Sequence, residues 1–302
     1  MYETQGNGEA TGHHGELLQG VFEDKNGRLH RGLISLPCRR LKSKATFRAT
    51  GGEKICITPP HCHKAERAAE LALKRFARIR TGGHLSIKSN IPVGRGMGSS
   101  TADVLASILA VLNYLNVQPS SGSIMQVAVN AETACDSTLF SQQAVLFAHR
   151  EGIVIESFSN SLPPIDYISV DTAPERTVDT LALEPAHYSA AEIETFRPLR
   201  GLLRRAISAS DLGLLGLVST ASARINERFL RKPRLHDIQA IGVRHGAVGI
   251  QVAHSGTVVG LMFDPTNRKT AENMERATCD LRIDGFKPSI VSHESELGGM
   301  SV

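Results

Sequence analysis

The chain has 302 residues, 41% of them hydrophobic and 5% aromatic, and its 34 Lys and Arg against 30 Asp and Glu give a formal charge of +4. This length and apolar content suffice for a full core in one large or two medium domains. The scattered charges disfavour nucleic acid but leave a small anionic ligand open, and the absence of a leader-like start or a long apolar run predicts a soluble, cytoplasmic protein without membrane contact.

The first half predicts alternating strands and helices. Apolar and alternating patterns indicate strands at 32–38, 44–50, 53–58 and 84–91, and helical spacing indicates helices at 63–79, 101–115 and 123–133. Residues 143–158 then indicate a strand, a turn at Glu151 and Gly152, and another strand.

Pro163 and Pro164 precede a new strand, which predicts a domain boundary there, with domains at 1–163 and 164–302. The second domain is expected to hold helices at 189–209 and 211–230, two strands within 246–264 and a helix at 271–283. The predicted fold class is therefore α+β, with two domains of similar size.

Five cysteines form an odd set without C-x-x-C spacing, so neither a disulfide framework nor a zinc ribbon is predicted. The triplet His61–His63 resembles a metal clip. Adjacent side chains point apart, however, and no second pair of ligands is visible, so a metal site there is disfavoured.

A loop rich in small residues, "GMGSS" at 96–100, leads directly into an apolar helical stripe. A helix N-terminus carries unsatisfied N–H groups and a partial positive charge, and it binds anions where small residues let a phosphate approach. Glycines remove Cβ obstruction at Gly94, Gly96 and Gly98, and hydroxyls for phosphate or magnesium follow at Ser99, Ser100 and Thr101. The sequence predicts a phosphate cradle; the alternative is an ordinary glycine-rich turn before a core helix.

Three well-known phosphate and nucleophile motifs do not fit. A P-loop needs Lys before Ser99 or Ser100, and none is there. The glycine spacing is too short for a dinucleotide fingerprint, and no strand with an acidic end follows. A nucleophile elbow needs glycine where Thr101 stands.

Pro92 and the run Gly96–Thr101 resemble the P-x-x-x-G-[LM]-[GA]-S-S-[AST] motif of the GHMP kinases, which include galactokinase, homoserine kinase and mevalonate kinase. Two further segments strengthen the resemblance. His14–Gly20, "HGELLQG", is similar to the G-E-L-x-Q-G signature of the L-threonine kinase branch used in cobalamin assembly. Ala253–Asp264, "AHSGTVVGLMFD", resembles the glycine-rich third motif of the same branch.

The resemblance implies an N-terminal domain with a left-handed βαβ unit, a ferredoxin-like C-terminal domain, and an active site between them. It also implies that ATP lies against the glycine loop. The residues expected to bind ATP are Pro92, Gly94, Gly96, Met97, Gly98, Ser99, Ser100 and Thr101. Of the hydroxyls, Ser99 is the candidate magnesium ligand.

Asp136 is the candidate catalytic carboxylate, because "ACDSTLF" resembles the P-T-D-S-T segment of the threonine kinase branch, with Ala134 and Cys135 in place of Pro and Thr. Phosphoryl transfer to an alcohol needs a carboxylate near the hydroxyl and cations near the phosphate. Glu132, four residues earlier, is a second candidate magnesium ligand. The alternatives are a helix cap or turn residue for Asp136 and a solvated carboxylate for Glu132.

The resemblance places acceptor contacts in the first and third motifs, at Glu16, Gln19, His254, Ser255 and Gly256. The alternatives are a polar turn between strands for the first motif and a tight hairpin with a surface histidine for the third. No role is assigned to the adjacent His13 and His14.

Together these observations predict an ATP- and magnesium-dependent kinase, monomeric or homodimeric, that phosphorylates L-threonine. Alternatives are a kinase for homoserine or another hydroxylated metabolite, a non-catalytic nucleotide-binding regulator, and, more distantly, an NAD-binding oxidoreductase.

Overall fold

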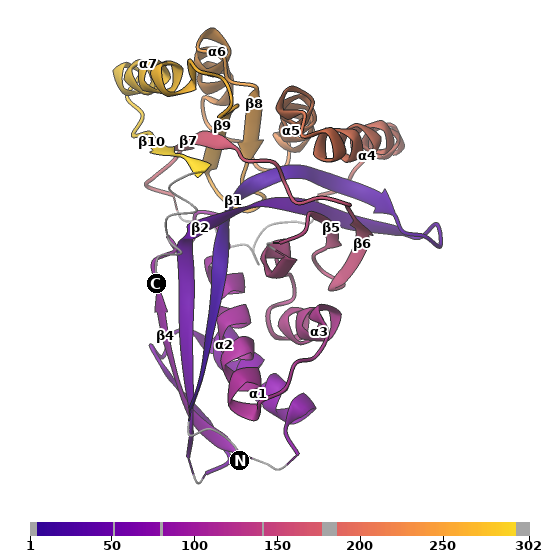
Figure 1. The fold of residues 1–302 in the computed structure, drawn as a ribbon, viewed down its shortest axis with the longest axis vertical. Coiled ribbons are helices and arrows are strands. Elements are labelled where there is room, and N and C mark those ends of the chain that lie inside the picture. The colour runs from indigo at the N-terminus through magenta and orange to yellow at the C-terminus, as the bar shows by residue number, and fades with distance from the viewer. Residues whose placement is uncertain (1–4, 51, 79–80, 141, 177–185, 294–302) are drawn as a thin grey trace.

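Two long antiparallel strands, β1 (Gln5–Glu23) and β2 (Leu29–Thr50), run through the length of the molecule (Figure 1). The computed structural model describes residues 5–50, 52–78, 81–140, 142–176 and 186–293. Its ten-stranded sheet has the order β10-β7-β9-β8-β1-β2-β4-β3, with β5 paired to β2 and β6 paired to β5. The α+β class is therefore confirmed.

The first half contains a βαβ unit. Strands β3 (Ile55–Thr58) and β4 (Gly82–Ser89) pair in parallel, and helix α1 (His63–Phe76) connects them. Helices α2 (Ser99–Leu115) and α3 (Ser121–Glu132) pack beside α1. Because α2 is apolar on nearly every face, it is the buried centre of this half, against β1 and β2.

The short helix η1 (Ser137–Phe140) and the hairpin of β5 (Val145–Ala148) and β6 (Ile153–Ser157) follow. The second half is built on β7 (Asp166–Asp171), β8 (Gly249–Val252), β9 (Val258–Phe263) and β10 (Ser289–Val291). Its helices are α4 (Ala190–Ala209), α5 (Leu212–Asn226), α6 (Leu235–Arg244) and α7 (Thr270–Ile283).

Helices α4 and α5 lie over the upper part of β1 in Figure 1, whereas α6 and α7 lie beyond β8 and β9. One buried cluster accordingly joins the two halves: Leu17 and Leu18 of β1 pack with Phe196 of α4 and Leu215 of α5. The boundary near residue 163 remains a prediction, and this shared core shows that strands of the first half carry helices of the second.

Most predicted elements are confirmed, with differences at their ends. The strands expected at 32–38 and 44–50 are one continuous strand, β2. The helix expected over 63–79 ends at Phe76, and Ile79 lies outside the described residues. The alternative interpretation of the first motif as a polar turn is wrong, because Glu16 and Gln19 both lie within β1. Register shifts and Gly15, with φ +69°, make that strand irregular there.

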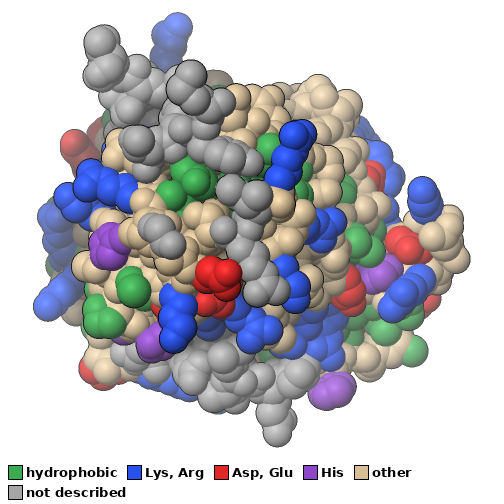
Figure 2. Space-filling view, turned by 90° about the horizontal axis from the view of Figure 1, so that it is seen from below, with side chains coloured by type: hydrophobic (Ala, Val, Ile, Leu, Met, Phe, Trp, Pro, Cys, Tyr) green, Lys and Arg blue, Asp and Glu red, His purple; other side chains and the backbone are tan. Residues whose placement is uncertain are grey.

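On the face drawn in Figure 2, Lys and Arg side chains recur between acidic, histidine and hydrophobic ones. The small positive charge is therefore not gathered into one basic surface on that face. None of the helices in the described ranges is long and apolar enough to cross a membrane.

Candidate active site

A cavity of about 1120 Å³ collects residues from both halves of the chain. Nearly every candidate site residue lines it. These are Gln19, Pro92, Gly94, Gly96, Met97, Gly98, Ser99, Ser100, Thr101, Glu132, Asp136, His254 and Ser255. The two others, Glu16 and Gly256, are buried, Glu16 beside His13 and Gly256 against the glycine loop.

The glycine loop ends at an uncapped helix N-terminus. Gly94, Gly96 and Gly98 have φ of 72°, 73° and 76°, which L-residues rarely adopt. Gly98 is the N-cap of α2 and offers no side-chain hydrogen bond, and the first turn holds no acidic residue. The first N–H groups of α2 therefore lack a protein cap at the cavity, as a phosphate site requires.

The second half of the chain holds this loop in place. A Cβ on Gly256 would lie 1.8 Å from the carbonyl oxygen of Arg95, so the third motif packs directly on the loop backbone. Arg95 also donates through Nη1 to the carbonyl oxygen of Arg176 (2.9 Å) and lies 3.2 Å from Asp171. The loop geometry thus depends on contacts from both halves.

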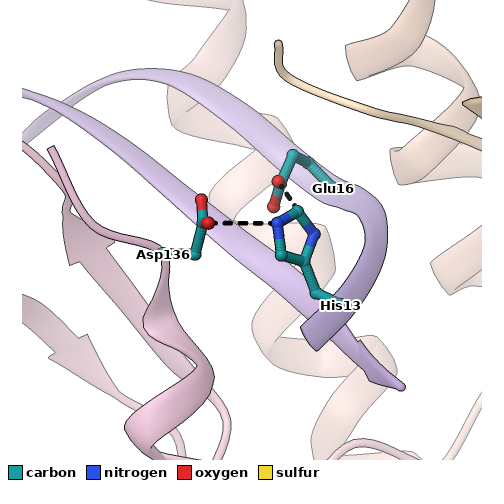
Figure 3. Close-up of side chains that lie close together, drawn as sticks. All are labelled: His13, Glu16 and Asp136. Atoms are coloured by element: carbon teal, nitrogen blue, oxygen red, sulfur yellow. Dashed lines mark ion pairs between the residues drawn. The ribbon is translucent and has the colours of Figure 1, made fainter. Parts of the chain in front are cut away.

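Asp136 lies beside this helix N-terminus and pairs with a histidine (Figure 3). Its Oδ2 lies 3.1 Å from Nε2 of His13, and Nδ1 of His13 lies 3.5 Å from Oε1 of Glu16. His13 and Glu16 are buried, at 2% and 1% exposure, while Asp136 retains access to the cavity. One imidazole thus bridges two carboxylates, using its two nitrogens on opposite sides of the ring.

The charges of these three groups depend on one another. Burial acts to lower the pKa of His13, but the carboxylates of Asp136 and Glu16 outweigh it and raise that pKa to about 9. For Asp136 burial acts to raise the pKa, and the His13 cation reverses this and lowers it to about 2. Burial raises the pKa of Glu16 to about 7. Near neutral pH the pair is an imidazolium and a carboxylate, and Asp136 can accept a proton.

Glu132 faces the same cavity from the end of α3. Its Oε2 accepts a hydrogen bond from the Thr101 hydroxyl (3.1 Å), and its Oε1 lies 3.4 Å from Nζ of Lys64. Burial raises its pKa despite these contacts. Glu132 is therefore not a solvated carboxylate, and with Asp136 and the hydroxyls of Ser99 and Ser100 it offers the hard oxygen donors that Mg²⁺ prefers. Its role as a magnesium ligand remains a prediction.

The first and third motifs meet in the cavity. Nδ1 of His254 lies 2.9 Å from Oε1 of Gln19. Burial lowers the pKa of His254 to about 4, so the neutral ring donates through Nδ1 and leaves Nε2 as an acceptor. Gln19 is fixed in turn, because Asn226 donates to its carbonyl oxygen (3.1 Å) and its N–H donates to Ser222. His254 is thus an oriented cavity residue and not a surface histidine.

Sequence reasoning missed the role of His13, as well as several cavity residues from other segments: Arg31, His149, Arg150 and Lys232. His13 stands directly before the G-E-L-x-Q-G signature, which was the one available signal. His14, its neighbour, contacts Ser169 and Gln251 instead and joins β1 to β7 and β8.

Replacing His13 by glutamine is expected to destabilise the fold by roughly 1–3 kcal/mol below pH 6.5, with a smaller effect at high pH. The pKa of His13 is raised from its ordinary 6.5 to about 9. Its stabilising contribution is therefore complete below pH 6.5 and is lost as the pH rises through 9. Thermal unfolding of both proteins between pH 6 and 10 measures this. A difference that grows with pH would contradict the ion pair.

An uncapped, glycine-flanked helix N-terminus beside an ionised carboxylate can serve phosphoryl transfer, which needs N–H donors around a phosphate and a carboxylate near the accepting hydroxyl. A sequence model of the GHMP kinases N terminal domain matches residues 63–145. The L-threonine kinase of Salmonella typhimurium is 32% identical over 181 residues, covering 60% of this chain and 59% of the relative. That of Citrobacter freundii is 30% identical over 182 residues, covering 60% and 62%.

The chain thus spans about three fifths of the length of these curated relatives. The crystal structure of homoserine kinase from Cytophaga hutchinsonii superposes with a TM-score of 0.68 at 14% identity, covering 96% of this chain and 94% of that one. The shared fold confirms the two-domain α+β architecture. The chain is thus similar in sequence to the N-terminal domain of the GHMP kinases and to L-threonine kinases, and similar in fold to a homoserine kinase.

Proposed function

We propose that this chain is an ATP- and magnesium-dependent kinase that transfers a phosphoryl group to the side-chain hydroxyl of a small amino acid, with L-threonine as the acceptor. The observation that carries this proposal is the position of Asp136 beside the uncapped N-terminus of α2, in a cavity lined by all three motifs. The L-threonine kinases among its relatives support the choice of acceptor.

The glycine loop would hold the triphosphate through the free N–H groups of α2 and the hydroxyls of Ser99 and Ser100. Glu132 and Ser99 are the residues that would hold Mg²⁺, which, when bound, would neutralise charge on the β- and γ-phosphates. Thr101 serves the protein itself, since its hydroxyl donates to Glu132 and accepts the backbone N–H of Asp136 (3.4 Å).

In the reaction, the acceptor oxygen bonds to the γ-phosphorus and the bond from that phosphorus to the ADP oxygen breaks. The proton of the acceptor hydroxyl passes to Asp136. Asp136 is ready for it because the His13 cation keeps its carboxyl group ionised. His13 thus positions and charges the base, without contacting the phosphate.

Two alternatives remain part of the proposal. A homoserine kinase or a kinase of another hydroxylated metabolite would share every feature of the phosphate side. A non-catalytic regulator would keep the glycine loop but would not need an ionised carboxylate next to it, so the pair of Asp136 and His13 argues against it. A cytosolic location and a role in cobalamin assembly belong to the same proposal.

With ATP and magnesium, L-threonine is expected to exceed L-homoserine in kcat/KM by at least about tenfold. The γ-hydroxyl of homoserine lies one methylene farther from the backbone, and misplacing a reacting oxygen by about 1 Å can cost about 100-fold. ADP release measures both rates, and phosphorus NMR identifies the product. Equal rates would favour the homoserine alternative, and ATP binding without transfer to either amino acid would point to a different acceptor.

A further inference from the structure

The charged side chains that line the cavity are partly separated by sign: Lys64 lies beside Glu132, but three other cations come from separate segments. Its acidic residues, Asp103, Glu132 and Asp136, come from α2 and from the segment that ends α3 and leads to η1. His149 and His254 also line the cavity, together with the cations Arg31 from β2, Arg150 from the turn after β5, and Lys232 from the segment after α5.

Within the described ranges of the chain, the side-chain nitrogens of these three cations form no ion pair with a carboxylate. Burial lowers the pKa of Lys232 to about 8, and the nearby charge of Glu227 partly opposes this. No hydrogen bond or ion pair is formed by the guanidinium of Arg31 or Arg150 with another described residue. Lys232 is 3% exposed, and its ammonium donates to the carbonyl oxygen of Leu230 (2.9 Å), while Glu227 accepts the Lys232 backbone N–H (2.9 Å). A buried ammonium without a paired carboxylate is costly, so a ligand that supplies the anion would offset that cost.

Arg228 lines the same cavity and provides the contrast. Its Nη2 pairs with Glu192 and also donates to the carbonyl oxygen of His187 (3.0 Å). Its charge is therefore already paired within the protein, whereas Arg31, Arg150 and Lys232 form no such side-chain ion pair with a described carboxylate.

The charges of Arg31, Arg150 and Lys232 influence the same two imidazole rings, those of His149 and His254. The imidazoles of His149 and His254 have centroids 5.1 Å apart. Burial is the main cause that lowers the pKa of both rings, and the charges of Arg31 and Arg150 lower that of His149 further, as those of Lys232 and Arg150 do for His254. The cations thus surround one small region, in which both rings are neutral.

We propose that Arg31, Arg150 and Lys232 bind an anionic group of the phosphoryl acceptor, a carboxylate or a phosphate monoester, next to His149 and His254. This inference rests on the proposed function and specifies its acceptor. Among the described carboxylates that line the cavity, Asp136 is the one whose charge acts on both rings, and it serves the reacting hydroxyl. Recognition of the acceptor therefore depends on its negative charge, and an ammonium group contributes less.

Matched acceptors test this. L-Threoninamide lacks the carboxylate of L-threonine but keeps its ammonium, and (R)-3-hydroxybutyrate lacks the ammonium but keeps the carboxylate. Losing the carboxylate should lower kcat/KM at least about 30-fold, because charged hydrogen bonds are lost and buried cations stay unpaired. Losing the ammonium should lower kcat/KM by a smaller factor. sn-Glycerol 3-phosphate in the same assay distinguishes a phosphate site from a carboxylate site.

Substitutions of Arg31 and Lys232 test whether these residues bind the anionic group of the acceptor. Arg31→Gln should raise KM for the anionic acceptor at least about tenfold without changing KM for ATP, and Arg31→Lys should restore part of it. Lys232→Met should act in the same direction. Arg31 is only half-buried, so its variant remains informative if Lys232→Met fails to fold. Arg276→Gln, on an exposed face of α7, is the matched control.

Binding measured by calorimetry, with the protein saturated by a non-hydrolysable ATP analogue, separates the two proposals. Selective binding of L-threonine or (R)-3-hydroxybutyrate over L-threoninamide, without transfer, would support the anion site and contradict the kinase function for these acceptors. Equal use or equal binding of L-threonine and L-threoninamide would overturn the anion site, as would an Arg31→Gln effect on KM for ATP alone. Binding of none of the probes would overturn it as well.

Discussion

Replacing Asp136 by asparagine is expected to leave ATP affinity nearly unchanged and to lower kcat by about 100- to 10,000-fold. Asparagine has the size of aspartate and can still hydrogen-bond to Nε2 of His13, 3.1 Å away. It cannot accept the proton of the acceptor hydroxyl. Steady-state ADP release measures kcat, and calorimetry with a non-hydrolysable ATP analogue measures binding.

Asp237→Asn, on the exposed side of α6, is a matched control that should retain full activity. Glu132→Gln provides a second comparison, because loss of a magnesium ligand should raise the magnesium concentration that the enzyme needs. Near-normal turnover by the Asp136 variant would remove it from the role of base and direct attention to Glu132.

Replacing Gly98 by valine is expected to weaken ATP binding by at least about 100-fold, or about 3 kcal/mol. Gly98 has φ +76°, which a branched residue adopts only with strain. Its added Cβ would lie 2.6 Å from Cδ2 of His13 and 3.4 Å from Oδ2 of Asp136. Valine would therefore displace the start of α2 and the paired side chains of His13 and Asp136. Turnover should fall together with the affinity for ATP.

Gly122→Val is the control for this change, because a Cβ at Gly122 meets no atom within 4 Å and its backbone is helical. Circular dichroism shows whether each variant folds, and calorimetry gives its affinity for the ATP analogue. A folded Gly98→Val protein with unchanged affinity would return the loop to the plain glycine-rich turn that the sequence also allowed.

Local features of the site could be predicted from the sequence, because each depends on neighbouring residues. The glycine loop and α2 follow from small residues next to an apolar helical stripe, and both are confirmed. Strand β1 was missed because its first residues, "QGNGEATGHHGE", are rich in glycine and polar residues and do not alternate. Helix α6 was missed as well, because its N-cap, Arg234, is not one of the usual capping residues.

Contacts between residues that are far apart in the sequence could not be predicted. His13 and Asp136 are far apart in sequence, and neither shows by its own neighbours that it has a charged partner. The same holds for Arg31 and Lys232, which join the cavity from β2 and from the segment after α5. The charges of these side chains act strongly on nearby groups because the surrounding fold wholly or partly buries them and leaves few other partners. A single sequence indicates poorly which polar side chains are buried.

The two ends of the chain must meet before the complete cavity exists. Contacts of β1 with β8 and with the third motif join residues 237 and 235 positions apart, in the pairs His14 with Gln251 and Gln19 with His254. Contacts between such distant residues form slowly, because a long loop has to close first. The glycine loop and Asp136 are already synthesised when the ribosome has yet to make β8 and β9. Nascent or truncated chains therefore carry the glycine loop and Asp136 without His254, a side chain that lines the cavity.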